Sequence, residues 1–492
     1  MITQQQLEKY LWGAATLLRG LIDAGDYKQY IFPLLFFKRI CDVYDEEYET
    51  ALTESGGNLE YASFTENHRF QIPKGAHWKN VRENTQNVGM AIQKAIRQIE
   101  KANPNTLFGI FGDAQWTNKQ RLNDETLINL IEHFSSRKLS IKNVPDDQLG
   151  NGYEYLIKQF ADDSGHTAAE FYTNRTVVEL MTLLMDPKPG EWIYDPTCGS
   201  GGMLLSCVNK LKADGKEYRS LKLYGQELNL MTSAIARMNM FLHGIEDFKI
   251  ARGNTLKHPA FLENDKLKKF NIILANPPYS IKHWNRKEFE KDPYGRNIYG
   301  TPPQGCADYA FQQHIIKSLD DKNGRCAILW PHGILFRDAE AMMRKKMIES
   351  DVVEAVIGLG PNLFYNSPME ACILICNKGK KKDRLGKILF INAVNEVKRK
   401  NAFSYLTDKH IKNIYQAFVS YNNIEGFTKV MSIKEVLEKN DNLNISLYVS
   451  NVQQNSVQKE VHLENLIQEW EKQSNNLRKD LKDLFETIAR SL

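Results

Sequence analysis

The sequence lacks the features that mark a membrane protein or an exported protein. Its 492 residues contain no apolar run of the roughly eighteen residues needed to cross a bilayer, and the chain begins with the polar stretch 3–6 instead of a signal peptide. The seven cysteines are odd in number and include no Cys-x-x-Cys pair, which indicates reduced thiols. We therefore expect a cytoplasmic protein without membrane association.

A strong charge of one sign is also missing. Lys and Arg number 64 against 60 Asp and Glu, which gives a net charge of +4 over the whole chain. A charge this small permits nucleic-acid binding but does not indicate it. The hydrophobic share of 42% and the charged share of 25% are typical of a globular protein, and the length predicts more than one domain.

The spacing of apolar residues divides the chain into three parts. Residues 1–150 show helical spacing, with clear helices expected at 88–99 and 125–134. Residues 151–430 alternate short apolar strands with helices, which predicts an α/β fold. Residues 431–492 form a tail.

Each flanking part raises a question of partners. Nothing in the helical part looks catalytic, and its aromatic and basic residues could face DNA or a partner, although a buried core is favoured: Tyr30, Phe36, Phe37, Lys38 and Arg39. In the tail, residues 463–488 carry apolar side chains at alternating spacings of four and three, interrupted only by Ser474. Such a seam predicts a helix that packs against another element or another subunit.

A strand, a glycine-rich loop and a helix follow one another near the start of the α/β part. Residues 192–194 form the strand, residues 195–202 (DPTCGSGG) form the loop, and apolar residues at helical spacing follow. This is the first turn of a nucleotide-binding sheet, but it does not match the dinucleotide fingerprint, because Leu204 stands where the third small residue belongs. Asp195 would attract a cationic amino group, whereas it would disfavour a phosphate.

Polar residues also end the next three predicted strands. Glu227 ends strand 221–227 and suits the two hydroxyls of a ribose, while Asn254 and Asn276 end later strands. Because parallel strands share their carboxyl edge, Asp195, Glu227, Asn254 and Asn276 are expected over one crevice.

The strand at 272–275 stops at the tetrad Asn276-Pro277-Pro278-Tyr279. The Asn276 side-chain oxygen and the Pro277 carbonyl could each accept one N–H of a flat amino group lying against Tyr279, and so aim the nitrogen lone pair outward. A strand-ending turn is the alternative for the tetrad alone.

Other stretches carry weaker signals. Thr173 or Asn174 could cap a helix whose N-terminus suits a carboxylate, and the long segment 281–306 could form a lid or contact DNA. Strands 352–357 and 371–376 have no helix between them, which favours an antiparallel pair. Cys372 and Cys376 lie in the second of these strands, where core packing is favoured over a metal site.

Taken in order, the loop 195–202, Glu227 and the tetrad resemble the S-adenosylmethionine-dependent amino methyltransferases of DNA, and segment 170–175 ahead of the loop is similar to their γ class. The helical start, the length and residues 308–311 and 362–364 resemble the modification subunit of type I restriction–modification systems. The resemblance implies a Rossmann-like, seven-stranded methyltransferase sheet, preceded by an all-α domain and followed by a helical tail for subunit association. It also implies methylation of adenine N6 and no metal.

The resemblance assigns roles residue by residue. The tetrad Asn276, Pro277, Pro278 and Tyr279 would be catalytic, and Phe364 would stack on the other face of the target base. The cofactor would be held by Glu170, Phe171, Tyr172, Thr173, Asn174, Arg175, Asp195, Thr197, Gly199, Ser200, Gly201, Gly202, Glu227 and Asn254. Two positions depart from the family: Asn174 replaces a usual proline, and Asn254 replaces a usual aspartate.

The resemblance implies partners as well. These are double-stranded DNA, a separate specificity subunit shared by two modification subunits, and a restriction or translocase subunit. Three alternatives stay open from the residues: a cytosine N4 methyltransferase, a protein-glutamine methyltransferase and a non-catalytic scaffold.

Overall fold

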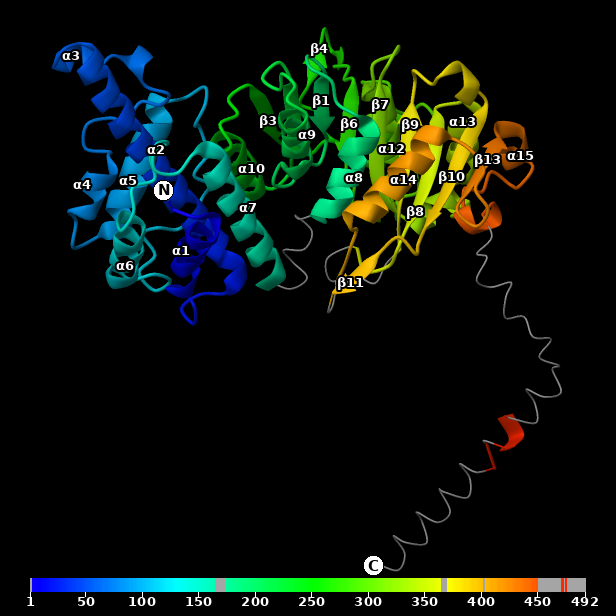
Figure 1. Cartoon of the computed structure of the whole chain (residues 1–492), viewed down its shortest axis with the longest axis horizontal. Coiled ribbons are helices and arrows are strands. Elements are labelled where there is room, and N and C mark those ends of the chain that lie inside the picture. The colour runs from blue at the N-terminus through cyan, green and yellow to red at the C-terminus, as the bar shows by residue number, and fades with distance from the viewer. Residues whose placement is uncertain are drawn as a thin grey trace, which may run out of the picture.

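The computed structural model describes residues 2–163, 173–363, 370–400, 403–449, 470–472 and 474–475. A helical half and a half built on a large sheet lie side by side along the longest axis of the molecule (Figure 1). The α/β half thus follows an all-helical half in the chain, as the sequence predicts.

The helices of the helical half pack around one apolar core, to which, among residues 2–163, only the short helix at 59–62 contributes no residue. The helices are α1 (Gln4–Thr16), α2 (Tyr27–Glu54), α3 (Leu59–Ala62), α4 (Trp78–Arg82), α5 (Val88–Ala102), α6 (Asp124–Ser135) and α7 (Asp146–Asp163). The five α2 residues weighed between core and contact surface are all buried: Tyr30, Phe36, Phe37, Lys38 and Arg39. The two basic ones pair internally, Lys38 with Asp42 and Arg39 with Asp146. The core prediction is confirmed.

The other half is organised by one sheet with the strand order β13-β10-β8-β9-β7-β6-β1-β2-β3. Its strands are β1 (Trp192–Asp195), β2 (Lys222–Glu227), β3 (Phe248–Arg252), β6 (Ile272–Ala275), β7 (Arg325–Pro331), β8 (Val353–Leu359), β9 (Ala371–Asn377), β10 (Lys387–Ala393) and β13 (Thr428–Ser432). Two small hairpins, β4 (Leu262–Glu263) with β5 (Lys266–Leu267) and β11 (Lys398–Lys400) with β12 (Phe403–Tyr405), lie outside it.

The sheet is larger than predicted. In the described residues it has nine strands instead of seven, because β10 and β13 extend it beyond β8. All residues of β8 are buried, so a neighbour is needed on that side, and β10 supplies it by pairing in parallel along residues 355–359. Strand β9 runs antiparallel to both β7 and β8, which confirms the predicted antiparallel pair, and Cys372 and Cys376 are buried in the core.

Helices cover both faces of the sheet (Figure 1). Residues alternate between the two faces: Ile193 belongs to the core under α8, α9 and α14, whereas Tyr194 belongs to the core under α12 and α13. The helices of this half are α8 (Arg175–Met185), α9 (Gly202–Ala213), α10 (Leu230–Leu242), α11 (Arg286–Glu290), α12 (Asp308–Ser318), α13 (Ala341–Glu349), α14 (Asp408–Ser420) and α15 (Ile433–Leu437).

Helix α10 joins the two halves. Its residues Met231, Ile235 and Met238 belong to the core of the helical half, although the helix follows β2, whereas Ala236 and Met240 belong to a core of the sheet half. The Tyr153 hydroxyl of α7 donates to the Ile235 carbonyl at 3.3 Å, and the Arg237 guanidinium donates to the Phe108 carbonyl at 2.6 Å. One apolar core therefore spans the junction.

The predicted domain limits fall within elements of this structure. Residue 150 lies inside α7, which packs on α1, and residue 430 lies inside β13, the edge strand of the sheet. Of the predicted tail helix the structure describes only residues 470–472 and 474–475, which are helical.

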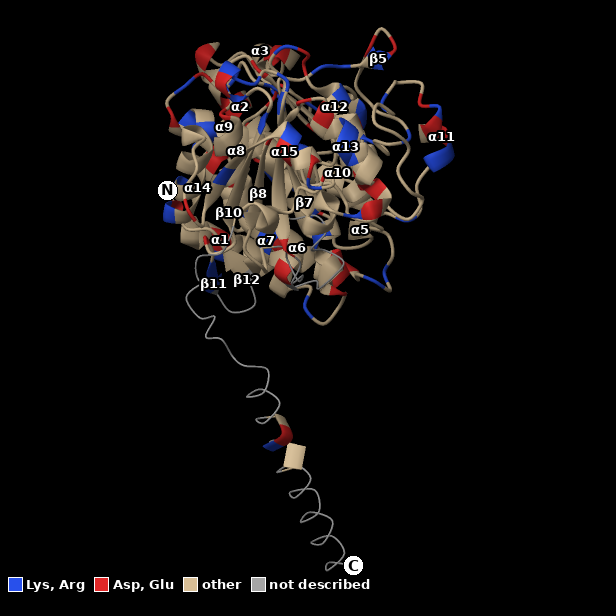
Figure 2. Ribbon diagram, turned by 90° about the vertical axis from the view of Figure 1, so that its right-hand side faces the viewer, with Lys and Arg blue, Asp and Glu red and all other residues tan. Residues whose placement is uncertain are grey.

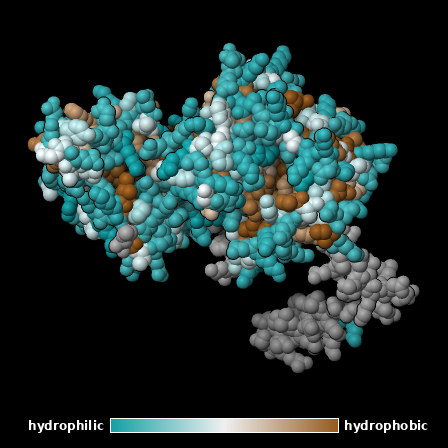
Figure 3. Space-filling model, turned by 45° about the horizontal axis from the view of Figure 1, so that its top comes forward, coloured by the Kyte–Doolittle hydropathy of each residue, from teal (hydrophilic) through white to brown (hydrophobic). Residues whose placement is uncertain are grey.

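Charges of both signs alternate along the ribbon, and the face drawn in Figure 3 is mostly hydrophilic with hydrophobic side chains in small groups (Figures 2 and 3). Among the described residues, no helix is both long and apolar enough to cross a membrane.

Candidate active site

The four strands that end in polar residues are neighbours. They are all parallel and adjacent in the order β6-β1-β2-β3, so their carboxyl ends meet at one edge of the sheet. Asp195, Glu227 and Ala275 are the last residues of their strands, and Asn276 and Asn254 follow immediately after β6 and shortly after β3. The four strand ends named from the sequence thus lie along one edge of the sheet.

Asp195 is a buried acid with few compensating bonds. Asp195 is only 2% exposed, and its Oδ1 accepts the Thr197 backbone N–H at 3.0 Å. Burial raises the pKa of Asp195 to about 8, and the neighbouring Glu227 charge adds to the rise. A carboxyl in this state gains from a cationic ligand, because the cation stabilises its charged form.

Glu227 is held by backbone N–H groups. One carboxylate oxygen accepts from Gly199 at 3.1 Å and the other from Asn229 at 2.8 Å. Burial raises the pKa of Glu227, and these N–H groups oppose the rise. Each oxygen keeps acceptor capacity, which matches two vicinal hydroxyls.

The glycine-rich loop leaves its backbone bare. Gly199 and Gly201 have φ of 51° and 81°, in the left-handed region that glycine adopts without strain. A Cβ at Gly202 would meet no other atom within 4 Å, whereas one at Gly201 would meet Met240 at 2.8 Å. The loop therefore presents open space on the side of Gly202.

A cavity of about 390 Å³ lies against this loop. Eight predicted site residues line it: Thr173, Arg175, Asp195, Thr197, Gly199, Ser200, Gly202 and Asn276. Sequence reasoning missed the other lining residues, among them Asn151 and Glu154, which come from α7 of the helical half. Glu154 forms an ion pair with Arg175, a contact that no local pattern in the sequence indicates.

Asn254 holds the turn after β3 with its side chain. It is exposed, and its Oδ1 accepts the backbone N–H groups of Leu256 and Lys257, both at 3.0 Å. These two bonds use both lone pairs of the oxygen, so any bond from that oxygen to the cofactor would have to displace one of them.

The Asn276 amide is fixed at both ends. Its Nδ2 donates to the Thr173 hydroxyl at 3.0 Å, and its Oδ1 accepts the Tyr279 hydroxyl. The Tyr279 ring contacts the buried Trp330 ring, with centroids 6.2 Å apart, and burial raises the pKa of Tyr279. Pro277 is buried and Pro278 is exposed.

The segment before the glycine-rich loop is described only in part. Asn174 is the N-cap of α8, as predicted for that position or its neighbour: its Oδ1 accepts the Thr176 N–H at 3.1 Å, and its Nδ2 donates to the Ser404 carbonyl at 2.9 Å. Glu170, Phe171, Tyr172 and Phe364 lie outside the described residues.

Segment 281–306 is anchored to the core. Arg296, one of its basic residues, is 2% exposed, pairs with Asp292 at 2.6 Å and donates to the Leu256 carbonyl at 2.7 Å. Arg296 thus ties the segment to the turn after β3 and is not available to DNA.

Comparisons with known proteins agree with this geometry. The profile of the family described as N-6 DNA Methylase matches residues 144–457, and that of the HsdM N-terminal domain matches residues 7–134. The chain is 31% identical to the methylase subunit of the type I restriction enzyme MjaVIII from Methanocaldococcus jannaschii, over 92% of this chain and 79% of the relative. It is 30% identical to the HindI methylase subunit from Haemophilus influenzae, over 75% of this chain and 84% of the relative.

A solved structure is also similar. The methyltransferase subunit of a type I restriction–modification system from Streptococcus thermophilus superposes with a TM-score of 0.79 at 29% identity, over 91% of this chain and all of that one. The chain therefore belongs to the N-6 DNA methylase family, in the branch of type I restriction enzyme methylase subunits.

Proposed function

We propose that this chain transfers a methyl group from S-adenosylmethionine to N6 of an adenine flipped out of double-stranded DNA. One observation carries the proposal: Asn276 lines the cavity formed by Asp195 and the glycine-rich loop, and also belongs to the Asn-Pro-Pro-Tyr tetrad. A donor in the cavity and an amine at the tetrad would meet at this side chain.

The residues of the cavity and its surroundings fit S-adenosylmethionine. Asp195, which lines the cavity, offers a buried carboxyl to its amino group, and the bare backbone around Gly202 offers room. Glu227 does not line the cavity but accepts the Gly199 N–H of the same loop, and it would offer two acceptor oxygens to the ribose. When bound, the cofactor supplies an electrophilic methyl group on a sulfonium. Thr173 and Arg175 would lie beside its methionine end, because they line the same cavity.

The tetrad orients the nitrogen that receives the methyl group. The Asn276 oxygen and the Pro277 carbonyl accept the two N–H groups of the adenine amine and leave its lone pair directed at the cavity. Thr173 holds the amide so that the oxygen, and not the nitrogen, faces the amine. For the amine to enter, the Tyr279 hydroxyl leaves Asn276 and its ring stacks on the base. Positioning provides the catalysis: the nitrogen lone pair would bond to the methyl carbon as the carbon–sulfur bond breaks, the sulfur would keep that electron pair as a neutral thioether, and the alkylated nitrogen would lose one proton to water.

Partners follow from the family. We propose that a separate specificity subunit selects the DNA sequence, that two copies of this chain serve one specificity subunit, and that the residues 431–492 contribute to the association. A restriction or translocase subunit would join the same cytoplasmic complex.

Co-purification with the neighbouring gene products followed by transfer of a labelled methyl group into DNA tests the proposal. A nucleoside digest is expected to place the label on adenine N6. Label on cytosine N4, label on protein, or no transfer by a complex that binds S-adenosylmethionine would overturn it. Efficient methylation of a defined sequence by the chain alone would contradict the need for a specificity subunit.

A further inference from the structure

The tetrad is followed by a sharp reversal of the chain. Ser280 has φ of 52°, in the left-handed region that residues with a side chain rarely adopt. Its backbone N–H donates to the Asp308 carboxylate at 2.8 Å. Asp308 is the first residue of α12 and is fully buried. A buried acid thus holds the turn that directs Tyr279 back toward Asn276.

Asp308 is itself held by a shared cation. Its other oxygen accepts from the Arg337 guanidinium at 2.5 Å, and the same guanidinium donates to Glu340 at 2.8 Å. Glu340 is 1% exposed, so both carboxylates are removed from water and depend on Arg337 for their counter-charge.

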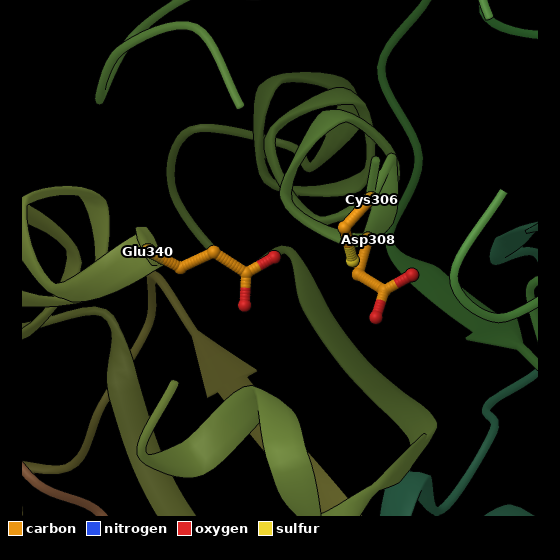
Figure 4. A group of neighbouring side chains, drawn as sticks. All are labelled: Cys306, Asp308 and Glu340. Atoms are coloured by element: carbon orange, nitrogen blue, oxygen red, sulfur yellow. The ribbon is translucent and has the colours of Figure 1, made fainter. Parts of the chain in front are cut away.

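Cys306, Asp308 and Glu340 come within 4.8 Å of one another, with Glu340 approaching from one side and the other two from the opposite side (Figure 4). Three such side chains resemble a metal site. Here, however, the Arg337 guanidinium already bridges the two carboxylates, in the place that a metal cation would take. The ion pairs with Arg337 therefore explain why the three side chains lie together, and no metal is needed.

Helix α12 reaches the tetrad by a second route. Gln312, one turn after Asp308 and fully buried, accepts the Trp330 indole N–H at 2.9 Å. The Trp330 ring contacts the Tyr279 ring. The same helix therefore fixes the backbone after Tyr279 through Asp308, and it fixes the Trp330 ring that contacts Tyr279 through Gln312.

We propose that Asp308, held by Arg337, is a positioning residue for methyl transfer: it sets the Ser280 turn and thereby the place of Tyr279 and of the Asn276 oxygen. The inference rests on the proposed function. Asp308 bonds to Ser280 and Arg337, and it is no partner of Asp195 or Glu227 or of the backbone N–H groups that hold them. Its loss should therefore affect the transfer step and leave the binding of S-adenosylmethionine intact.

The test compares Asp308→Ala and Asp308→Asn in the full complex. Single-turnover rates are measured at saturating S-adenosylmethionine and DNA, and the cofactor Kd is measured by calorimetry. We expect Asp308→Ala to lower the rate by ~10²-fold with a nearly unchanged Kd, because an error of about 1 Å in placement has a cost of this order. The rate of Asp308→Asn should lie between those of the wild type and Asp308→Ala, because the amide oxygen can still accept from Ser280 but the amide cannot neutralise the charge of Arg337.

A second substitution separates positioning from general damage. Ser280→Gly alone should be near wild type, and Ser280→Gly combined with either Asp308 variant should recover part of the rate, because glycine adopts φ of 52° without the hydrogen bond. Asp338→Asn changes an exposed acid in the same segment as Arg337 and serves as the matched control. If Asp308→Ala does not fold, the comparison of Asp308→Asn with the double variant Asp308→Asn, Ser280→Gly decides.

Wild-type rates in the Asp308 variants would overturn the inference. So would a loss of rate matched by an equal loss of cofactor affinity, or no recovery with Ser280→Gly in a folded protein. Failure of the proposed function is distinct, because it would appear as absence of adenine methylation by the wild-type complex.

Discussion

The two halves of the crevice hold their polar side chains in different ways. On the cofactor side, Asp195 and Glu227 accept backbone N–H groups from the turns beside them. On the tetrad side, Asn276 is bound by the side chains of Thr173 and Tyr279. Backbone donors are present whatever the neighbouring residue is, whereas side-chain partners vanish on substitution. Replacing a neighbouring side chain should therefore leave the acids of the cofactor side in place, whereas on the tetrad side it should lower the rate.

The largest effect is expected from Asn276→Ala. Loss of one preorganised acceptor should lower kcat by ~10²–10³-fold. Calorimetry should show an almost unchanged affinity for S-adenosylmethionine. An equal loss of affinity and rate would mean that the two sides of the crevice are not separable.

The mirror experiment is Glu227→Gln. The amide lacks the charge and puts a donor where one backbone N–H and a hydroxyl seek an acceptor, so cofactor affinity should fall by ~10–100-fold, as for loss of bonds to a charged group. The rate at saturating cofactor should stay close to wild type. A lower saturated rate would contradict the division of labour.

The pKa of Asp195 predicts a pH dependence confined to the cofactor side. The folded, ligand-free protein keeps a proton that the unfolded chain releases above its ordinary pKa of 3.8, so this group's contribution to stability is complete below that pH and is lost as the pH rises through about 8. Because a cationic amino group favours the ionised form, cofactor affinity should fall by ~10-fold per pH unit below pH 8. Calorimetry in buffers of different ionisation enthalpy should show proton release on binding, and Asp195→Asn should abolish it.

The smallest effect is expected from Thr173→Val. The isosteric valine removes the acceptor of the Asn276 amide, and the amide then samples the flipped orientation. A loss of about 5-fold in kcat corresponds to one ordinary hydrogen bond. Thr173→Ser, which keeps the hydroxyl, is the matched control, and equal rates in the two variants would show that Thr173 does not orient the amide.

The same contrast explains what the sequence could predict. Asp195, Glu227 and Asn276 were identifiable because each lies at the carboxyl end of a predicted strand, and the parallel order of the strands brings their ends together. The burial of Arg296, within the segment 281–306 that could form a lid or contact DNA, was not predictable, since it depends on a turn 40 residues earlier. Glu154 and Asp308 escaped a functional assignment for the same reason: their partners, Arg175 and Ser280, are distant in the chain.

The sheet size shows a second limit. Strands 352–357 and 371–376 were recognisable as strands, but periodicity does not say which strand pairs with which. The count of nine depended on pairing at the β8 edge, which only the assembled structure determines.

Helix α10 gives the junction a mechanical meaning. It begins three residues after Glu227, yet its apolar face is buried in the helical half. A partner protein that bound the helical half would therefore also hold the helix that follows Glu227, the residue proposed to bind the ribose. A movement of the helical half would then reach the proposed cofactor site through helix α10, without any change in the tetrad.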